Sequence, residues 1–295
     1  MTFAPRMSEH EALMWQIEKD PWFDPSGSSL AICDGPISSA DLDRRIRWAI
    51  VSTPRLRQRV VPSMGKLSTP AWQVDPEFDL AYHVRRIALS GDGSRRALFD
   101  LAMLLHQDPF DRTRPLWRLT IIDGLAGGKS ALLIKMHHTI ADGIGALKMA
   151  EFYMQLSRDD ELPPEVDFDD YPVEPEPEDS PGAASSLPFL RRLAGEVATW
   201  GADPMRVVDL GSGLVASAQE AIGDVFGSSD QAGSSPLFAN RSRGRHLEVL
   251  TIDLAKAKKA SGRLGGTIND LFLTGIADGT LAYHDELGAD RRTSA

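Results

Sequence analysis

Apolar positions recur every three to four residues in several stretches of the chain, which is the spacing of one helix face. Each of these stretches predicts a helix with one side turned to a core. One predicted helix begins at the capping pair Ser38 and Asp41, and its residues Leu42, Ile46, Ala49 and Ile50 share a face. The other predicted helices are Ser8–Lys19, Ser94–His106, Ile144–Ser157, Leu187–Trp200, Met205–Phe226 and Thr267–Tyr283.

Other stretches are short apolar runs or alternate between apolar and polar residues, which predicts strands. These strands are Ser28–Asp34, His83–Leu89, Leu116–Asp123, Lys129–Met136 and His246–Leu254. The glycine-rich residues 124–128 separate two of them and predict a hairpin. Helices and strands intermingle before residue 158, so we expect an α/β (α+β) fold there.

An acidic, proline-rich stretch divides this pattern. Residues 158–180 hold eleven acids and one base, so they carry a net charge of −10, equal to that of the whole chain. Prolines and like charges favour an extended linker. We therefore expect a first domain at 1–157, a linker at 158–181, a helical connecting segment at 182–234 and the start of a second domain at 235–295. The remaining chain is near neutral, which gives no support for nucleic-acid binding.

The composition bears on the cellular compartment and on whether the chain crosses a membrane. Among 295 residues there is one cysteine, Cys33, so an intramolecular disulfide is excluded and a cytoplasmic location is expected. The sequence shows no signal peptide and no run of about 18 apolar residues, so we expect no membrane-spanning helix.

Residues 137–143 concentrate titratable groups as no other stretch does. His137 and His138 follow a predicted strand, and Asp142 and Gly143 come directly after. Histidine exchanges protons near neutral pH, so a histidine fixed at a strand end is a candidate general base. Side chains alternate along a strand, so the two histidines point in different directions and only one serves a given site.

The same residues have two other interpretations. Two histidines and an aspartate suggest zinc, but adjacent strand histidines diverge and no cysteine ligand lies nearby, so we expect no metal site. The residues could also be packed histidines followed by a helix cap. Gly143 and Gly145 weaken this interpretation, because paired glycines at a helix start allow close approach to the backbone.

Three motifs, taken in order, resemble the bacterial wax ester synthase/diacylglycerol acyltransferase family. They are HHxxxDG at residues 137–143, PLW at Pro115, Leu116 and Trp117, and ND at Asn269 and Asp270. The stretches 7–15, 111–114, 235–237 and 265–267 are also similar to the family. HHxxxDG alone is shared with a wider superfamily that includes peptide-synthetase condensation domains, whereas the three motifs together are more specific.

The resemblance implies a chloramphenicol acetyltransferase-like, CoA-dependent acyltransferase fold. It implies that His138 is the general base, with His137 beside it and Asp142 in a structural role. The implied reaction transfers a long-chain acyl group from acyl-CoA, a co-substrate, to diacylglycerol or a long-chain alcohol. No other cofactor is implied, and the products would be triacylglycerol or wax ester.

Family members continue well past the ND motif, whereas this sequence ends at Ala295, so we expect a complete first domain and a partial second one. A non-catalytic lipid-binding remnant, or a subunit that needs a complementary C-terminal half, therefore stays open as an alternative. The helices predicted within 187–226, which include Arg191 and Arg192, suit either a peripheral membrane or lipid-droplet surface or packing on a further domain.

Overall fold

The structure is a computed structural model of the whole chain. It describes residues 6–20, 22–62, 69–141, 143–154, 161–168, 170–173, 237 and 242–288, without the side chains of residues 143–147. The chain divides into two compact units, Met1–Arg206 and Val207–Ala295. Each is described by itself.

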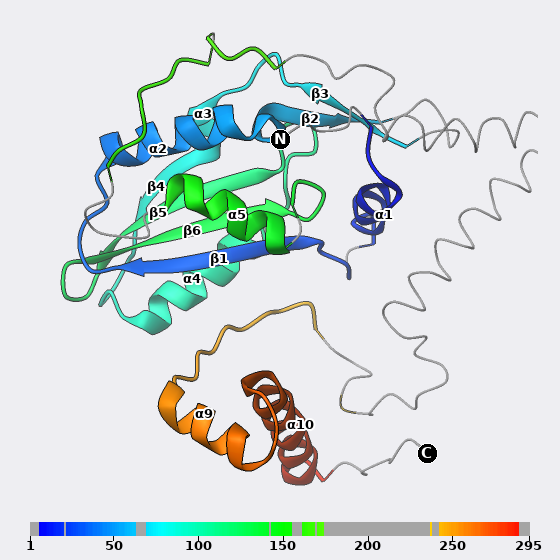
Figure 1. The fold of residues 1–295 in the computed structure, drawn as a ribbon, viewed down its shortest axis with the longest axis vertical. Coiled ribbons are helices and arrows are strands. Elements are labelled where there is room, and N and C mark those ends of the chain that lie inside the picture. The colour runs from blue at the N-terminus through cyan, green and yellow to red at the C-terminus, as the bar shows by residue number, and fades with distance from the viewer. Residues whose placement is uncertain are drawn as a thin grey trace, which may run out of the picture. The chain divides into compact units, whose positions relative to one another are not determined.

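A four-stranded mixed sheet forms the centre of the first unit (Figure 1). Its strands are β1 (Ser26–Cys33), β4 (Val84–Ala88), β5 (Trp117–Leu125) and β6 (Lys129–His137), in the order β1-β6-β5-β4. Strands β5 and β6 form the predicted antiparallel hairpin, β1 pairs antiparallel with β6, and β4 pairs parallel with β5. β6, which ends at His137, is thus an inner strand paired on both sides.

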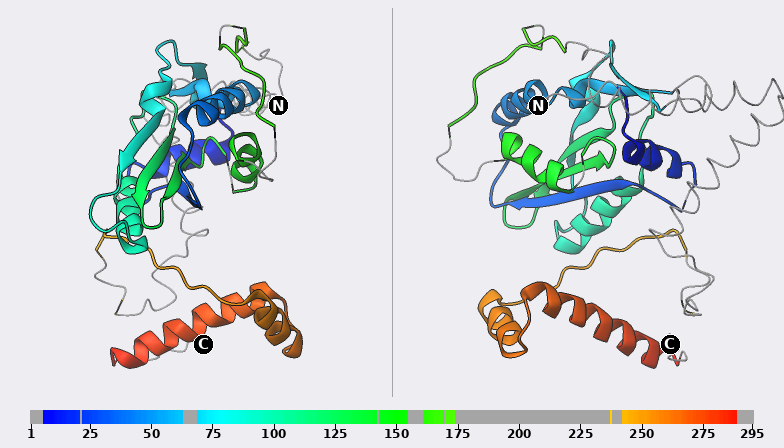
Figure 2. Two further views of the ribbon diagram at one scale, coloured as in Figure 1. Left: turned by 90° about the vertical axis from the view of Figure 1, so that its left-hand side faces the viewer. Right: turned by 45° about the vertical axis from the view of Figure 1, so that its right-hand side comes forward.

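Helices cover both faces of this sheet (Figures 1 and 2). Helices α2 (Ser39–Ser52) and α5 (Gly143–Tyr153) lie on one face and α4 (Arg95–Gln107) on the other. On the α2 face the buried core includes Ile46, Ile50, Leu119, Ile121, Leu132 and Ile134. Strands covered on both faces need apolar residues at consecutive positions, which explains the continuous runs in the sequence.

Several short elements at the edge of the first unit were not predicted from the sequence. They are the 3-10 turn Pro54–Arg57, strands β2 (Gln58–Val61) and β3 (Ala71–Val74), which pair antiparallel, and helix α3 (Leu80–His83). The strand predicted over His83–Leu89 is shorter in the structure, because His83 ends α3 and β4 begins at Val84. Helix α1 (Glu9–Ile17) agrees with its prediction and is capped by Ser8.

The described part of the acidic segment packs on other residues of the first unit without forming a helix or strand. Arg44, Arg45 and Arg57 donate hydrogen bonds from their side chains to its carbonyl oxygens. The ring of Phe168 meets that of Phe78 edge to face, 5.8 Å between centroids. Residues 161–168 and 170–173 are therefore anchored, while the domain boundaries predicted at 158 and 181 stay predictions.

In the second unit the structure describes two packed helices, α9 (Leu254–Arg263) and α10 (Ile268–Glu286). Helix α10 was predicted, but α9 was not. The strand predicted over His246–Leu254 is wrong: residues 242–253 form no strand and Leu254 begins α9. A strand needs a ladder partner, and the alternating side chains of this stretch face solvent, with Leu250 88% exposed. The helices predicted within 187–226 lie outside the described residues.

Candidate active site

The two histidines sit where β6 ends and a tight turn begins. His137 is the last residue of the strand, and its backbone N–H donates to the carbonyl of Leu116 at 3.0 Å. The N–H of His138 donates to the carbonyl of Pro25 at 2.8 Å, and that of Ile140 to the carbonyl of His137 at 2.9 Å. Main-chain hydrogen bonds from the starts of β5 and β1 therefore fix the backbone of this turn.

The side chain of His137 is fully buried. Its Nδ1 accepts the backbone N–H of Thr139 at 3.1 Å and lies 2.8 Å from the Thr139 hydroxyl. Its ring meets the Trp15 indole edge to face, with centroids 6.4 Å apart. Burial, and then the positive charge of Arg112, lowers the pKa of His137 to about 4, so the ring is neutral at physiological pH.

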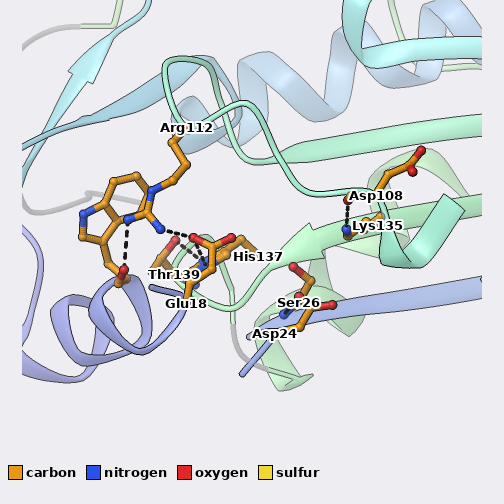
Figure 3. Close-up of polar contacts among 9 residues, drawn as sticks. Glu18, Asp24, Ser26, Asp108, Arg112, Lys135, His137 and Thr139 are labelled. Atoms are coloured by element: carbon orange, nitrogen blue, oxygen red, sulfur yellow. Dashed lines mark hydrogen bonds and ion pairs between the residues drawn. The ribbon is translucent and has the colours of Figure 1, made fainter. Parts of the chain in front are cut away.

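Glu18 and Arg112 form a charged pair against His137 (Figure 3). The Arg112 guanidinium contacts the Glu18 carboxylate in an ion pair and donates at 2.9 Å to the carbonyl of Trp15, over whose ring it stacks. Glu18 Oε2 lies 3.7 Å from Nε2 of His137. Burial raises the pKa of Glu18 while Arg112 lowers it, so the arginine offsets the cost of a half-buried carboxylate.

Lys135 lies two residues before His137 on β6 and is also buried. Its Nζ donates to the carbonyl of Asp108 and lies 4.6 Å from the centre of the Phe110 ring. Burial lowers the pKa of this amine. Asp24 opposes that shift through its charge and accepts the backbone N–H of Ser26 at 3.1 Å. The polar side chains on this face of β6 are therefore held by neighbours in the protein.

His138 differs from its neighbour because its side chain is exposed. A Cβ placed at Gly27 of β1 would lie 3.8 Å from its Nε2, an ordinary contact, so the ring lies beside the start of β1. The structure thus separates the two histidines as strand alternation predicts: one inside, the other at the surface. Of the two, His138 alone can meet a reactant without the turn opening.

The PLW residues support the base of this turn. Leu116 is completely buried and provides the carbonyl that His137 binds. Trp117 donates from Nε1 to the carbonyl of Leu56 at 2.8 Å, and its ring stacks on that of His83 at 4.6 Å. His83 Nδ1 lies 2.8 Å from the Trp117 carbonyl, and burial lowers the pKa of His83 to about 4. These contacts tie β5 to the edge elements.

The other residues expected at a site fall elsewhere. Asp142 lies outside the described residues, and of Gly143 only the place at the start of α5 is described. Asn269 is exposed in the first turn of α10. Asp270 completes a capping box with Thr267, accepting its N–H at 2.7 Å, and this hydrogen bond lowers the pKa of Asp270. The structure does not place this motif relative to the histidines.

Within the described ranges, no cluster of three His, Cys, Asp or Glu side chains has an arrangement that could hold a metal ion. In the same residues, no helix combines the length and the apolar character that crossing a membrane requires.

Sequence reasoning did not identify Glu18, Arg112 or Thr139 as site residues. Glu18 and Arg112 lie 94 residues apart, and no periodic pattern connects them. Arg112 stood in a stretch similar to the family, directly before PLW, and Thr139 within the HHxxxDG motif. The place of Arg112 and Thr139 within these family-like stretches was the feature of the sequence that could have identified them.

The fold and the histidine turn together define the class of protein. The structure is similar to the wax ester synthase/diacylglycerol acyltransferase from Marinobacter aquaeolei VT8, with a TM-score of 0.62 over 98% of this chain and 63% of that one. At 19% identity this likeness shows the fold, which is the expected CoA-dependent acyltransferase fold.

The chain belongs to the wax ester synthase/diacylglycerol acyltransferase family, whose catalytic-domain pattern matches residues 7–272. A relative in Mycobacterium tuberculosis, provisionally named a diacylglycerol O-acyltransferase, is 34% identical over 97% of this chain and 60% of its own length. Another from that species, a probable diacylglycerol O-acyltransferase, is 30% identical over 78% of this chain and 48% of its own. This chain therefore spans three fifths or less of these relatives.

Proposed function

We propose that the protein containing this chain transfers a long-chain acyl group from acyl-CoA to the hydroxyl of diacylglycerol or of a long-chain alcohol. Family membership supports this reaction class. The observation that carries it here is the exposed imidazole of His138 on a turn whose backbone is fixed on both sides. A fixed, accessible histidine is the group that this chemistry requires.

In the proposed reaction His138 takes the proton of the acceptor hydroxyl while its oxygen attacks the thioester carbonyl. The carbon–sulfur bond then breaks, and the imidazolium returns the proton to the CoA thiolate. The products are an ester and free CoA, so protons and electrons balance without a covalent acyl-enzyme. A positioned general base contributes roughly 10²–10⁴ to the rate.

His137 and Asp142 have supporting roles in this proposal. His137 is completely buried, so it shapes the turn instead of touching the reactants. For Asp142 we propose a structural role, as the family resemblance implies. Asn269 and Asp270 are proposed as part of the second domain's contribution, with Asp270 shaping the first turn of α10.

Two features of the setting belong to the same proposal. The acceptors are lipids, so we propose that the protein works peripherally at a membrane or lipid-droplet surface. We further propose that residues corresponding to the rest of the longer relatives complete the site, since this chain spans 60% of one of them.

The test is ester formation from labelled palmitoyl-CoA with dioleoylglycerol or with hexadecanol, followed by chromatography of the lipid products. We expect labelled triacylglycerol or wax ester from the protein and a loss of about 10²-fold or more in His138→Ala. The matched control is His10→Ala, which changes an exposed histidine on α1. The proposal fails if His138→Ala retains full turnover, or if the longest available form of the protein makes no ester.

A further inference from the structure

We propose that Glu18 and Arg112 act as a positioning pair: they hold the His137 imidazole in its Nε2-protonated form and so fix the turn that presents His138. This inference rests on the proposed function, because it assigns the pair a purpose in that same site. In this proposal His137, Glu18 and Arg112 together stabilise the conformation of the turn, although Glu18 and Arg112 are distant from His137 in sequence.

The hydrogen bonds of Thr139 assign the proton on His137. A backbone N–H can only donate, and that of Thr139 points at Nδ1 of His137 at 3.1 Å. Nδ1 must therefore be an acceptor without a proton. The buried ring is neutral, so its one N–H must be on Nε2.

Nε2 of His137 points toward the Glu18 carboxylate. The separation of 3.7 Å from Oε2 is longer than a hydrogen bond, and among the described residues this Nε2 has no hydrogen-bond partner. A buried N–H needs a nearby acceptor, and a carboxylate at this distance stabilises it electrostatically. In the opposite tautomer a lone pair on Nε2 would face the Glu18 carboxylate, and an N–H on Nδ1 would face the Thr139 N–H. Both neighbours therefore favour the Nε2-protonated form of His137.

Arg112 holds Glu18 in place. Its guanidinium contacts the carboxylate and, through a second nitrogen, donates to the carbonyl of Trp15 at 2.9 Å. Trp15 lies in α1 and Glu18 directly after it, so one guanidinium fixes the end of this helix. A planar, multi-donor cation suits this task better than the single ammonium of lysine.

The support reaches His138 through the main chain. The bond from Thr139 to Nδ1 closes the turn on one side of His138, and the bond from His138 N–H to Pro25 closes it on the other. If the ring of His137 shifts, Thr139 loses its acceptor and the turn relaxes. Misplacing a catalytic group by about 1 Å reduces turnover by up to about 10²-fold.

The first test needs no turnover. In protein labelled with ¹⁵N-histidine, ring-nitrogen correlation spectra at pH 7 show which nitrogen of His137 carries the proton. We expect a protonated Nε2 and a bare Nδ1. A proton on Nδ1 would overturn the proposal even if the protein makes ester normally, and the expected tautomer would stand even if the substrate class were wrong.

The second test separates positioning from bulk stability. Glu18→Ala should lower kcat about 10- to 100-fold at a temperature where the variant is folded, with KM for acyl-CoA changed less than about threefold. Glu18→Gln should recover most of kcat because its amide oxygen still faces Nε2–H. Arg112→Lys should lower kcat as Glu18→Ala does. The surface control Arg96→Lys should leave kcat close to that of the wild type.

Glu9→Ala changes an exposed acid on the same helix and is the matched control for Glu18→Ala. The His138 ring signals should shift in Glu18→Ala and stay in place in Glu9→Ala. A Glu18→Ala variant that loses melting temperature but keeps the wild-type kcat and the His138 signals would show a merely structural pair and overturn the proposal.

Discussion

The histidine motif and the ND motif of this chain are built in contrasting ways. The turn at His137 and His138 is held by segments distant in sequence, from Glu18 and Pro25 to Arg112 and Leu116. The ND motif is held by its own neighbour: Thr267 and Asp270 bond each other at the start of α10. One site depends on the tertiary fold and the other on a local helix cap.

This contrast continues into the packing around each motif. Strands β5 and β6 are buried over most of their length, whereas α10 exposes large apolar side chains, among them Phe272, Leu273 and Ile276. A site fixed by tertiary contacts is sensitive to distant substitutions. A site fixed by a cap responds mainly to changes in its own turn.

Among single substitutions, removing the anchor of the PLW motif should produce the largest change in stability. Trp117→Ala deletes a buried indole that stacks on His83 and bonds the Leu56 carbonyl, so the free energy of unfolding should fall by about 3–5 kcal/mol. Denaturant unfolding measures it. Trp22→Ala removes the same side chain where it is 56% exposed, and a loss of similar size there would contradict the tertiary account.

Acid should weaken the first unit through its two buried histidines. The pKa values of His83 and His137 are lowered to about 4 from an ordinary 6.5. Between these values the unfolded chain binds protons that the folded chain does not. The stability that the two neutral histidines contribute to the folded state is therefore fully present above pH 6.5. It declines as the pH falls toward 4, by roughly 3 kcal/mol for each histidine.

Urea unfolding between pH 7 and pH 4 measures this slope. His83→Phe keeps a ring in the stack between Phe78 and Trp117 and should reduce the decline by about half. His246→Ala, at an exposed position, should leave the decline as it is. An unchanged slope in His83→Phe would show that this histidine titrates alike in both states.

The smallest effect is expected at the helix cap of the second unit. Thr267→Ala removes the hydroxyl that accepts the Asp270 N–H and should destabilise the first turn of α10 by about 1 kcal/mol. Hydrogen exchange of the Asp270 amide measures it. Thr274→Ala changes a threonine inside the same helix, whose hydroxyl bonds the Asp270 carbonyl, and should have little effect. Altered exchange in the β6 amides would contradict a purely local role.

The sequence predicted those parts of the fold that local patterns determine. The β5–β6 hairpin, the face of α2 formed by Leu42, Ile46 and Ile50, and the cap at Ser38 all follow from periodicity and turn chemistry. The family motifs also pointed to the fold class, which the structural likeness confirms.

What the sequence did not predict depends on distant partners. Strands β2 and β3 are four residues each and exist only as a pair, so neither gives a clear pattern alone. The alternation at residues 246–254 predicted a strand, yet among the described residues this segment has no neighbouring strand to pair with. Glu18 lies near the end of a predicted helix, and its place beside His137 depends on how α1 packs.

The central claim is that the adjacent histidines have separate tasks, with His137 buried as a support and His138 exposed as the base. Brief modification with diethyl pyrocarbonate, followed by peptide fragmentation in a mass spectrometer, tests it most directly. We predict that His138 is modified in the folded protein, that His137 is not, and that acyl transfer falls in proportion to the modified fraction of His138. Equal modification of both histidines, or full activity with His138 modified, would contradict the account.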